Sequence, residues 1–435
     1  MKKQDIKKKK KTTSKKKKKD NVFTRIDNWF KKLERRIFND RDDNSNSNFS
    51  LLEVIIIILI SILFGIIIGY LITFSKSGSA SDSNIEEIVD TYHSIVNDYY
   101  GDVDKDKISE AAIKGMIDAL DDPYSNYMDT DSTGDFNEQI DGTFVGIGVV
   151  VMYNEEYNTI IEVYKNSPAE TAGLKKDDVI IKVDGEDVKE VHGDDIAKRI
   201  RGIEGTMVHL TVRRGEEELE FDVIRGKIDI KSVSSEVMKV DDKKIGYLRI
   251  ENFAANTYGQ FVKELKSLEK KKIDSLVLDV RSNPGGHLIQ TRQILSLFFN
   301  KKTVLYQIQT KNSKKKVYSL TNDERKYPIA VLIDGGSASA SEILASCFKD
   351  NYKKVTIIGT KSYGKGTVQK SQSLSNGTSI KYTTEKWLTS KGKWIHKKGI
   401  KPDIEVELDE EYANNPSHET DKQLQKALET LKESK

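Results

Sequence analysis

Residues 329–350 read IAVLIDGGSASASEILASCFKD. The first five residues are all apolar, which is typical of a strand that is buried on both faces of a sheet. Small and turn-forming residues follow from Asp334 to Ser339, and the remainder has the composition of a helix. The stretch therefore predicts a buried strand, a tight turn and a helix, with a serine exposed at the carboxyl end of the strand.

Segments on both sides of this stretch repeat the alternation of strand and helix. The expected strands are 243–250, 274–281 and 354–360, and the expected helices are 257–271 and 288–299. Strands that alternate with helices of about 10–15 residues indicate βαβ units and a largely parallel sheet. A further short helix is predicted at Glu419–Ser434, because its leucines share one helical face.

A different pattern precedes this core. From about Gly142 the chain consists of short β-rich runs such as FVGIGVVVM and DVIIKVDG, with turn signals at Asp184-Gly185 and Arg214-Gly215. Short helices are expected at Ser167–Leu174 and Gly193–Ile203. The sequence thus predicts an α/β fold, α+β overall, with a compact β-module inserted before the βαβ core.

Two amphipathic helices are expected before the β-module. Apolar residues recur at three- and four-residue spacing from Ile85 to Tyr99 and again from Ile108 to Leu120, and Asp122-Pro123 ends the second helix. The apolar faces of these helices have no assigned partner in the sequence. A homodimer formed through them is therefore one expectation.

A membrane span is predicted at Val54–Phe74, where 21 consecutive residues carry no charge. As a helix they would be about 31 Å long, which is close to the hydrocarbon thickness of a bilayer. A cleaved signal peptide is the weaker interpretation, because its apolar region is usually only about 7–15 residues long. A buried soluble helix is weaker still, because it would need apolar neighbours on every side.

Charge indicates the orientation of this span. Residues 1–50 contain 18 Lys and Arg against 7 Asp and Glu, so they carry 18 − 7 = +11, whereas the other 385 residues carry (71 − 18) − (68 − 7) = −8. Positive flanks stay in the cytoplasm, so residues 75–435 are expected outside a cell membrane that the chain crosses once. The Lys-rich 1–20 segment is compatible with nucleic acid or a localisation signal, but beside a span it favours contact with anionic membrane lipid. The acidic body argues against nucleic acid as a partner.

Ser337, Ser339 and Ser341 are candidates for a catalytic nucleophile, since they stand where a helix N-terminus offers free N–H groups to an oxyanion. Ser-x-x-Glu at Ser339–Glu342 equally fits an ordinary helix cap. The single cysteine, Cys347, excludes an intramolecular disulfide and a Cys-rich zinc site. No metal or organic cofactor is expected.

A catalytic serine needs a base, and Lys365 is the preferred candidate. It lies between two glycines just after a buried strand, and a buried lysine loses its proton easily. A lone lysine is more often a solvated surface group. His287 is the one histidine in a suggestive place, because it follows Asn283-Pro284-Gly285-Gly286 directly. That turn could present N–H groups to a ligand or simply end a strand.

Taken together, the ordered motifs resemble those of the C-terminal processing peptidases, the tail-specific serine proteases of family S41. The motifs are Asp122–Ser125, Phe144–Gly148, Leu278–Gly286, Gly336–Glu342, Gly364–Gln369 and Gly399–Asp403, and they extend over residues 85–407. The resemblance implies a nucleophile at Ser339, a base at Lys365 and an orienting residue at Gln369. It implies an oxyanion site made by Ala340 with Gly285 or Gly286. The residues alone leave Ser337 and Ser341 as alternative nucleophiles.

The resemblance also identifies the β-module as a PDZ domain. Such a domain binds an extended peptide as an added strand and holds its terminal carboxylate on backbone N–H groups. The carboxylate-binding loop maps to Phe144, Val145, Gly146, Ile147, Gly148 and Val149, and Arg201 lies in a motif that can couple the PDZ and protease domains. The expected partners are proteins or peptides with free C-termini. The expected domains are a basic tail (1–50), a membrane helix (51–75), a linker (76–84), a helical part (85–131), a PDZ domain (132–227), a peptidase core (228–408) and a tail (409–435).

Two other classes of protein compete with this prediction. A non-catalytic PDZ scaffold on a membrane stalk would need no intact site, so the presence of Ser339, Lys365 and Gln369 disfavours it. A structural surface protein is disfavoured by the buried parallel strands.

Overall fold

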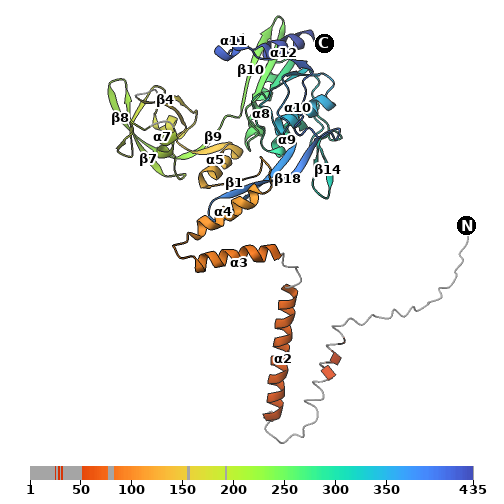
Figure 1. Ribbon diagram of the computed structural model, residues 1–435. Helices are drawn as coiled ribbons and strands as arrows, with labels where there is room; N and C mark the ends of the chain where they lie inside the picture. The colour runs from red at the N-terminus through yellow and green to blue at the C-terminus, as the bar shows by residue number, and fades with distance from the viewer. Residues whose placement is uncertain are drawn as a thin grey trace, which may run out of the picture. The chain divides into compact units, whose positions relative to one another are not determined.

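The computed structural model describes residues 25, 28–29, 31–32, 51–76, 83–153, 157–191 and 194–434. Two compact units are present, Met1–Val103 and Asp104–Lys435. The basic tail expected at 1–50 lies almost entirely outside the described residues. Figure 1 shows the elements of the larger unit, with its sheets and helices coloured along the chain.

The smaller unit includes α2 (Leu51–Lys76) and α3 (Ser83–Asp98). The described side chains of α2 run from residue 55 to residue 70, so the expected span Val54–Phe74 extends past them at both ends. No helix is both long and apolar enough to cross a bilayer in the part of the chain that was described. On α3 the expected apolar face is present and exposed, with Ile85 59% and Ile88 48% accessible.

The core of the larger unit is a six-stranded sheet. Its strands in spatial order are β10 (Val233–Val240), β11 (Lys243–Ile250), β12 (Ser275–Asp279), β15 (Ile329–Ile333), β16 (Val355–Gly359) and β19 (Ile404–Glu405). Only the β10–β11 pair is antiparallel, and the pairs from β11 to β19 are parallel. The largely parallel sheet is therefore confirmed, and every residue of β12 and β15 is buried, as continuous apolar strands require.

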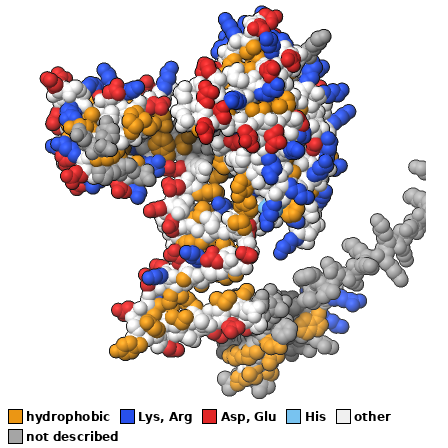
Figure 2. Space-filling view, turned by 45° about the horizontal axis from the view of Figure 1, so that its top comes forward, with side chains coloured by type: hydrophobic (Ala, Val, Ile, Leu, Met, Phe, Trp, Pro, Cys, Tyr) orange, Lys and Arg blue, Asp and Glu red, His pale blue; other side chains and the backbone are white. Residues whose placement is uncertain are grey.

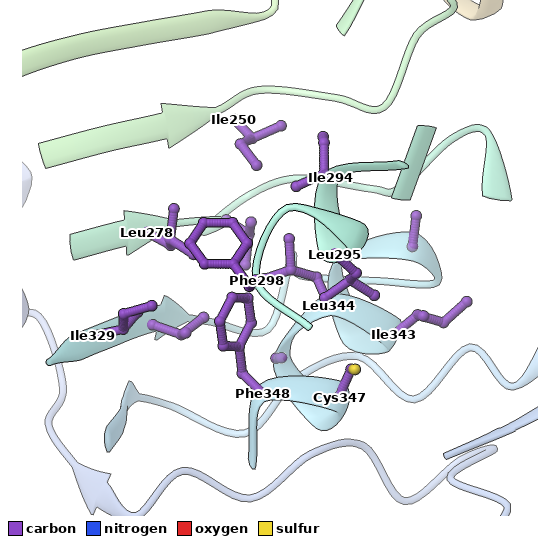
Figure 3. Close-up of a cluster of buried hydrophobic side chains, with 14 of the residues drawn as sticks. Ile250, Leu278, Ile294, Leu295, Phe298, Ile329, Ile343, Leu344, Cys347 and Phe348 are labelled. Carbon is purple, nitrogen blue, oxygen red and sulfur yellow. The ribbon is translucent and has the colours of Figure 1, made fainter. Parts of the chain in front are cut away.

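Helices cover this sheet on both sides. One side carries α8 (Thr257–Lys270), α9 (Leu288–Ser296) and α10 (Ala340–Asn351), and α12 (Lys422–Glu433) packs on β11, β12, β15 and β16. Figure 3 shows Phe298 and Phe348 meeting between Leu278 of β12 and the side chains of α10. Each such fully buried side chain contributes about 1.5–3 kcal/mol of transfer free energy, so this layer holds α10 against the sheet.

A second, antiparallel sheet was not predicted from the sequence. Its members are β1 (Asn126–Met128), β13 (Val304–Gln309), β14 (Lys314–Tyr318), β17 (Thr367–Ser373) and β18 (Ser379–Thr389). Strand β18 is the centre, because β1, β13 and β17 all pair with it. Lys314, Lys315 and Lys316 on the edge strand β14 are exposed. Figure 2 shows basic and acidic side chains interspersed over the visible face of this unit.

The β-module forms its own core. A six-stranded antiparallel sheet contains β3 (Val149–Tyr153), β4 (Asn158–Val163), β5 (Val179–Val183), β6 (Glu186–Asp187), β7 (Met207–Arg214) and β8 (Glu217–Ile224). The expected helices are present as α6 (Pro168–Ala172) and α7 (Asp194–Ile200). The run FVGIGVVVM is not one strand: β2 (Thr143–Gly146) separates from β3 at Gly148, where φ is +81°, and pairs with β9 (Gly226–Asp229).

Three further helices complete the larger unit. They are α4 (Lys105–Asp118), α5 (Thr130–Asp141) and α11 (Glu410–Asn414). The carboxylate of Asp104 caps α4 by accepting the N–H groups of Asp106 and Lys107 at 3.0 Å. Helix α5 begins at a similar cap, Asp129, and ends at Gly142, whose φ of +70° terminates the helix.

Candidate active site

The turn between β15 and α10 presents Ser339 at the start of the helix. Ser339 has a φ of +52°, which is rare for a residue with a side chain and costs backbone strain. Hydrogen bonds to neighbouring segments stabilise this turn. In one of them the Ala338 N–H donates to the Asn283 carbonyl at 3.0 Å. Ser339 is half-buried and lines a cavity of about 660 Å³.

The two neighbouring serines have a different role. Ser337 and Ser341 are fully buried. The Ser337 hydroxyl donates to the Val280 carbonyl at 2.8 Å, and the Ser341 hydroxyl donates to the Asn283 carbonyl at 2.9 Å. Both serines therefore fasten the turn to the segment after β12, and only Ser339 of the three reaches the cavity.

That segment, Asn283-Pro284-Gly285-Gly286, lies directly against the serine turn. Gly285 has a φ of +104°, and a Cβ on it would stand 2.9 Å from the Cβ of Ser339 and 3.0 Å from the nitrogen of Ala340. Only glycine permits this approach. The Gly285 N–H is already taken by Asn283 Oδ1 at 2.9 Å.

The N–H groups of Ala340 and Gly286 are different. Within the described part of the chain, neither group has a hydrogen-bond acceptor. Ala340 is the first residue of α10, so its N–H also lies at the positive end of the helix dipole. The two N–H groups expected to hold an oxyanion are thus both available beside Ser339, and Gly286 is the better candidate of the two glycines.

Glu342 connects the serine turn to the loop that carries Lys365. Its buried carboxylate accepts four hydrogen bonds: Oε2 from the N–H groups of Ser339 (2.9 Å) and Lys365 (2.8 Å), and Oε1 from the Gly364 N–H (2.7 Å) and the Ser362 hydroxyl (2.6 Å). Burial raises the pKa of Glu342, and these donors act in the opposite direction. The capping role expected for Glu342 is present, but three of the four donors come from residues 362–365.

Lys365 lines the same cavity as Ser339. Its Nζ lies 4.9 Å from the ring centroid of Tyr124, and its carbonyl accepts the indole N–H of Trp387 at 2.7 Å. Burial lowers the pKa of Lys365 below its ordinary value, the charge of Lys381 lowers it further, and Asp122 and Glu342 oppose the change. A lysine in this setting loses its proton more easily than one in water.

Gln369 shares the cavity but does not contact Lys365 by a hydrogen bond. It lies on β17, where its amide donates to the hydroxyls of Thr367 and Thr383, each at 3.0 Å. The chain between Lys365 and Gln369 is extended, so the two side chains are not brought together by a helical turn. The orienting groups that the structure does place at Lys365 are Tyr124 and Glu342.

Two histidines are near the site. His287 lines the cavity, so it remains the rival of Lys365 for the role of base. His396 lies behind Lys365, where its Nδ1 accepts the Gly366 N–H at 3.3 Å and its ring packs edge-on against Tyr124. Burial lowers the pKa of His396, which keeps this ring neutral.

The remaining cavity wall is mainly apolar and contains one more cation. The apolar lining includes Phe136, Ile140, Phe253, Leu288 and Ile289, and Lys381 of β18 completes the wall. An apolar wall of this kind suits an extended peptide with hydrophobic side chains. Sequence reasoning did not single out Lys381, since one lysine among many carries no local signal. It included Tyr124 only as part of the motif Asp122–Ser125, without a role at Lys365.

Behind the glycine turn lies a buried ionic network. The Arg281 guanidinium contacts Asp279 at 2.6 Å and Asp421 at 2.7 Å, and Tyr247 donates its hydroxyl to Asp279 at 2.8 Å. Asp421 is the N-cap residue of α12. The C-terminal helix is therefore joined directly to the strand end that leads into Gly285 and Gly286.

The segment expected to bind a peptide carboxylate, Phe144–Val149, covers the end of β2, the connection Ile147-Gly148 and the first residue of β3. Arg201 lies above the Phe144 ring, 5.5 Å from its centroid, and pairs with Glu138 of α5 at 3.1 Å. Helix α5 also supplies Phe136 and Ile140 to the cavity wall. One helix thus touches both the β-module and the cavity.

Comparison with known proteins agrees with this architecture. Residues 136–213 match the PDZ domain, residues 244–406 match peptidase family S41, and residues 71–132 match the activating protease CtpB N-terminal domain. The molecule is therefore a serine endopeptidase that carries a PDZ domain.

Full-length relatives define the family more narrowly. The carboxy-terminal processing proteases CtpB and CtpA of Bacillus subtilis are 39% and 40% identical to the chain, over 79% and 80% of its length and 72% and 74% of theirs. A solved structure of a photosystem II D1 C-terminal processing protease aligns with a TM-score of 0.45 at 25% identity, over 74% of this chain and 86% of that one. On the sequence relationships, the chain belongs to the carboxy-terminal processing proteases of family S41.

Proposed function

We propose that this protease is anchored in the cell membrane, faces outward, and cleaves proteins that its PDZ domain selects by their C-termini. Ser339 is the nucleophile and Lys365 is the general base. The observation that carries the catalytic part is that Ser339, Lys365 and the Gly286 segment line one cavity, with two unpaired N–H groups beside the serine.

The reaction follows from these positions. Neutral Lys365 accepts the proton of the Ser339 hydroxyl as Oγ bonds to the substrate carbonyl carbon, and the resulting oxyanion is held by the N–H groups of Ala340 and Gly286. The Lys365 ammonium then gives its proton to the leaving amine, and an acyl-enzyme remains. Water attacks this ester while Lys365 again accepts a proton, which releases the acid and restores Ser339.

The PDZ domain is proposed to recognise the substrate's C-terminus. A peptide would add as a strand to the module and place its carboxylate at the loop Phe144–Val149. Arg201 supports a coupling to catalysis, because it contacts Phe144 of this loop and Glu138 of α5, the helix that also lines the cavity. Loss of that pairing would change the position of the cavity wall.

Membrane anchoring rests on the uncharged run Val54–Phe74 and on the basic tail before it. In this proposal membrane lipid contacts both segments. A homodimer is proposed through α3, whose apolar face is exposed. Protease added to intact cells should digest residues beyond 75 and spare the basic tail, and protection of the body would reverse the topology.

The catalytic proposal is tested with the purified chain and a peptide that ends in an apolar residue with a free carboxylate. Cleavage by the wild type and its loss in Ser339→Ala would support it. Binding of the peptide without any cleavage by the wild type would support the alternative, a membrane-tethered PDZ scaffold. Binding and cleavage are read separately, by fluorescence anisotropy and by mass spectrometry.

A further inference from the structure

The cavity contains two lysines, and neither has a carboxylate partner. Lys365 and Lys381 both line it and both are half-buried. Among the described residues, no carboxylate lies within ion-pair distance of either ammonium group. Two cations without a carboxylate partner in one half-buried site are unfavourable, so the arrangement calls for a functional explanation.

Pairing of the strands explains why Lys381 faces the cavity. On β18 it stands opposite Ser371 of β17, and Thr383, two residues further on, stands opposite Gln369. Ser371 and Gln369 line the cavity as well, because residues two apart on a strand share a face. The Nζ of Lys381 lies 5.2 Å from the ring centroid of Phe136, so an aromatic face stabilises its charge.

The acidic groups around Lys365 are already engaged. Glu342 accepts four hydrogen bonds from other donors, and Asp122 accepts the Ser125 hydroxyl at 2.6 Å and the Tyr124 N–H at 3.2 Å. Tyr124 is neutral, since burial and its contact with Tyr363 raise its pKa to about 12. His396 is neutral too. Asp122 and Glu342 favour the charged form of Lys365, and the ammonium of Lys381 in the same cavity acts against it.

We propose that Lys381 is a positioning residue for catalysis, whose retained positive charge disfavours protonation of the neutral Lys365 amine and so keeps Lys365 available as the base. This inference rests on the proposed role of Lys365. A neighbouring cation is one of the established ways to activate a lysine amine. Burial lowers the pKa of both lysines, and the charge of Lys381 lowers the pKa of Lys365 further.

The test compares the pH dependence of kcat/KM for the wild type, Lys381→Met and Lys381→Arg, with a peptide substrate that has no ionisable side chain. Removal of the charge should move the midpoint of the rising limb upward by about one pH unit, which is roughly a tenfold loss of rate below the midpoint. Lys381→Arg keeps the charge and should keep the midpoint. Lys370→Met is the matched control, because Lys370 is exposed on β17 and lies outside the cavity lining.

A second measurement reads Lys365 without relying on turnover. In the Ser339→Ala background, the rate at which acetic anhydride modifies Lys365 is followed by mass spectrometry as a function of pH, with and without Lys381→Met. An upward shift of the modification midpoint supports the electrostatic effect. If the modification midpoint shifts but the activity profile does not, Lys381 does act on Lys365, but Lys365 is not the general base.

An unchanged midpoint in both measurements, with Lys381→Met folded by circular dichroism, would overturn the inference. The inference would also be overturned if Lys381→Met raised KM for substrates with an acidic residue while both midpoints stayed in place. Lys381 would then bind a substrate anion. If Lys381→Met does not fold, Lys381→Gln replaces it, and the same midpoints decide.

Discussion

The carboxylate of Glu342 accepts the main-chain N–H of Ser339 at 2.9 Å. The same carboxylate accepts the N–H of Lys365, so one side chain fixes the separation between the proposed nucleophile and the proposed base. Both contacts are made within the protein itself, so the proposed nucleophile and base are held by a fixed backbone, and such preorganisation favours rapid proton transfer.

Replacement of this carboxylate should damage both stability and catalysis. In Glu342→Gln one oxygen becomes an NH₂ group, which then faces N–H donors that need an acceptor. Each unsatisfied buried donor costs about 1–3 kcal/mol, so we expect the free energy of unfolding to fall by roughly 2–4 kcal/mol. Urea unfolding and peptide hydrolysis measure the two effects, and a variant with normal turnover would contradict the role of Glu342.

Alanine substitutions of the three serines in the turn should differ in their effects on hydrolysis and on stability. Ser339→Ala should abolish hydrolysis with an intact fold. Ser337→Ala and Ser341→Ala each lose a bond to a buried carbonyl, so we expect about 1 kcal/mol of destabilisation with hydrolysis retained. Trapping of an acyl-enzyme and mapping of the modified residue identify the nucleophile directly. An acyl group mapped to Ser337 or Ser341 would identify that serine, and not Ser339, as the nucleophile.

Activity should rise with pH through one ionisation that lies below the ordinary lysine value of 10.5. Activity rises with pH because protonated Lys365 is inactive as a base. Burial lowers the pKa at which the neutral amine forms. Lys365→Ala and Lys365→Arg should both be inactive, because the first lacks a base and the second stays protonated. His287→Ala should retain most activity. A dead His287 variant beside an active Lys365→Arg would assign the base to histidine.

The oxyanion site can be tested at Gly285 without touching either N–H group. The new Cβ in Gly285→Ala would meet Ser339 and Ala340 at 2.9 and 3.0 Å, which displaces the serine turn. We expect kcat to fall roughly 10²–10³-fold, which is the usual cost of a disturbed oxyanion site. Gly335→Ala is the matched control, since a Cβ there meets nothing within 4 Å. Equal activity of the two variants would refute the proposed geometry.

The ionic network predicts that the C-terminal helix supports the site. Asp421→Asn leaves Arg281 with one buried carboxylate partner in place of two and weakens the cap of α12. Removal of one partner from a buried ion pair costs about 3–5 kcal/mol. Thermal unfolding should register the loss, and an unchanged midpoint temperature would show that this network is not a source of stability.

Elements with local signals were predictable from the sequence. The buried strands β12 and β15 are continuous apolar runs, and the serine turn follows one of them. The antiparallel sheet was missed because β14 and β17 are polar, and because β1 and β13, which pair with β18, are distant from it along the chain. Likewise, the spacing of Ser339 and Glu342 predicts only a helix cap. The other hydrogen-bond donors to Glu342, at 362–365, are 20 to 23 residues further along the chain. The sequence alone does not show that Lys381 faces the cavity, because this follows from the register of β17 on β18.

The connection between Asp421 and Arg281 also makes two distant segments of the sequence depend on each other. Arg281 lies before the glycine turn, and Asp421 begins α12, 140 residues further along the chain. A buried arginine with too few counter-charges is unstable. Undocking of α12 should therefore loosen the segment that leads into Gly285 and Gly286, so local opening of the two segments should be cooperative, with amide hydrogens in both exchanging together.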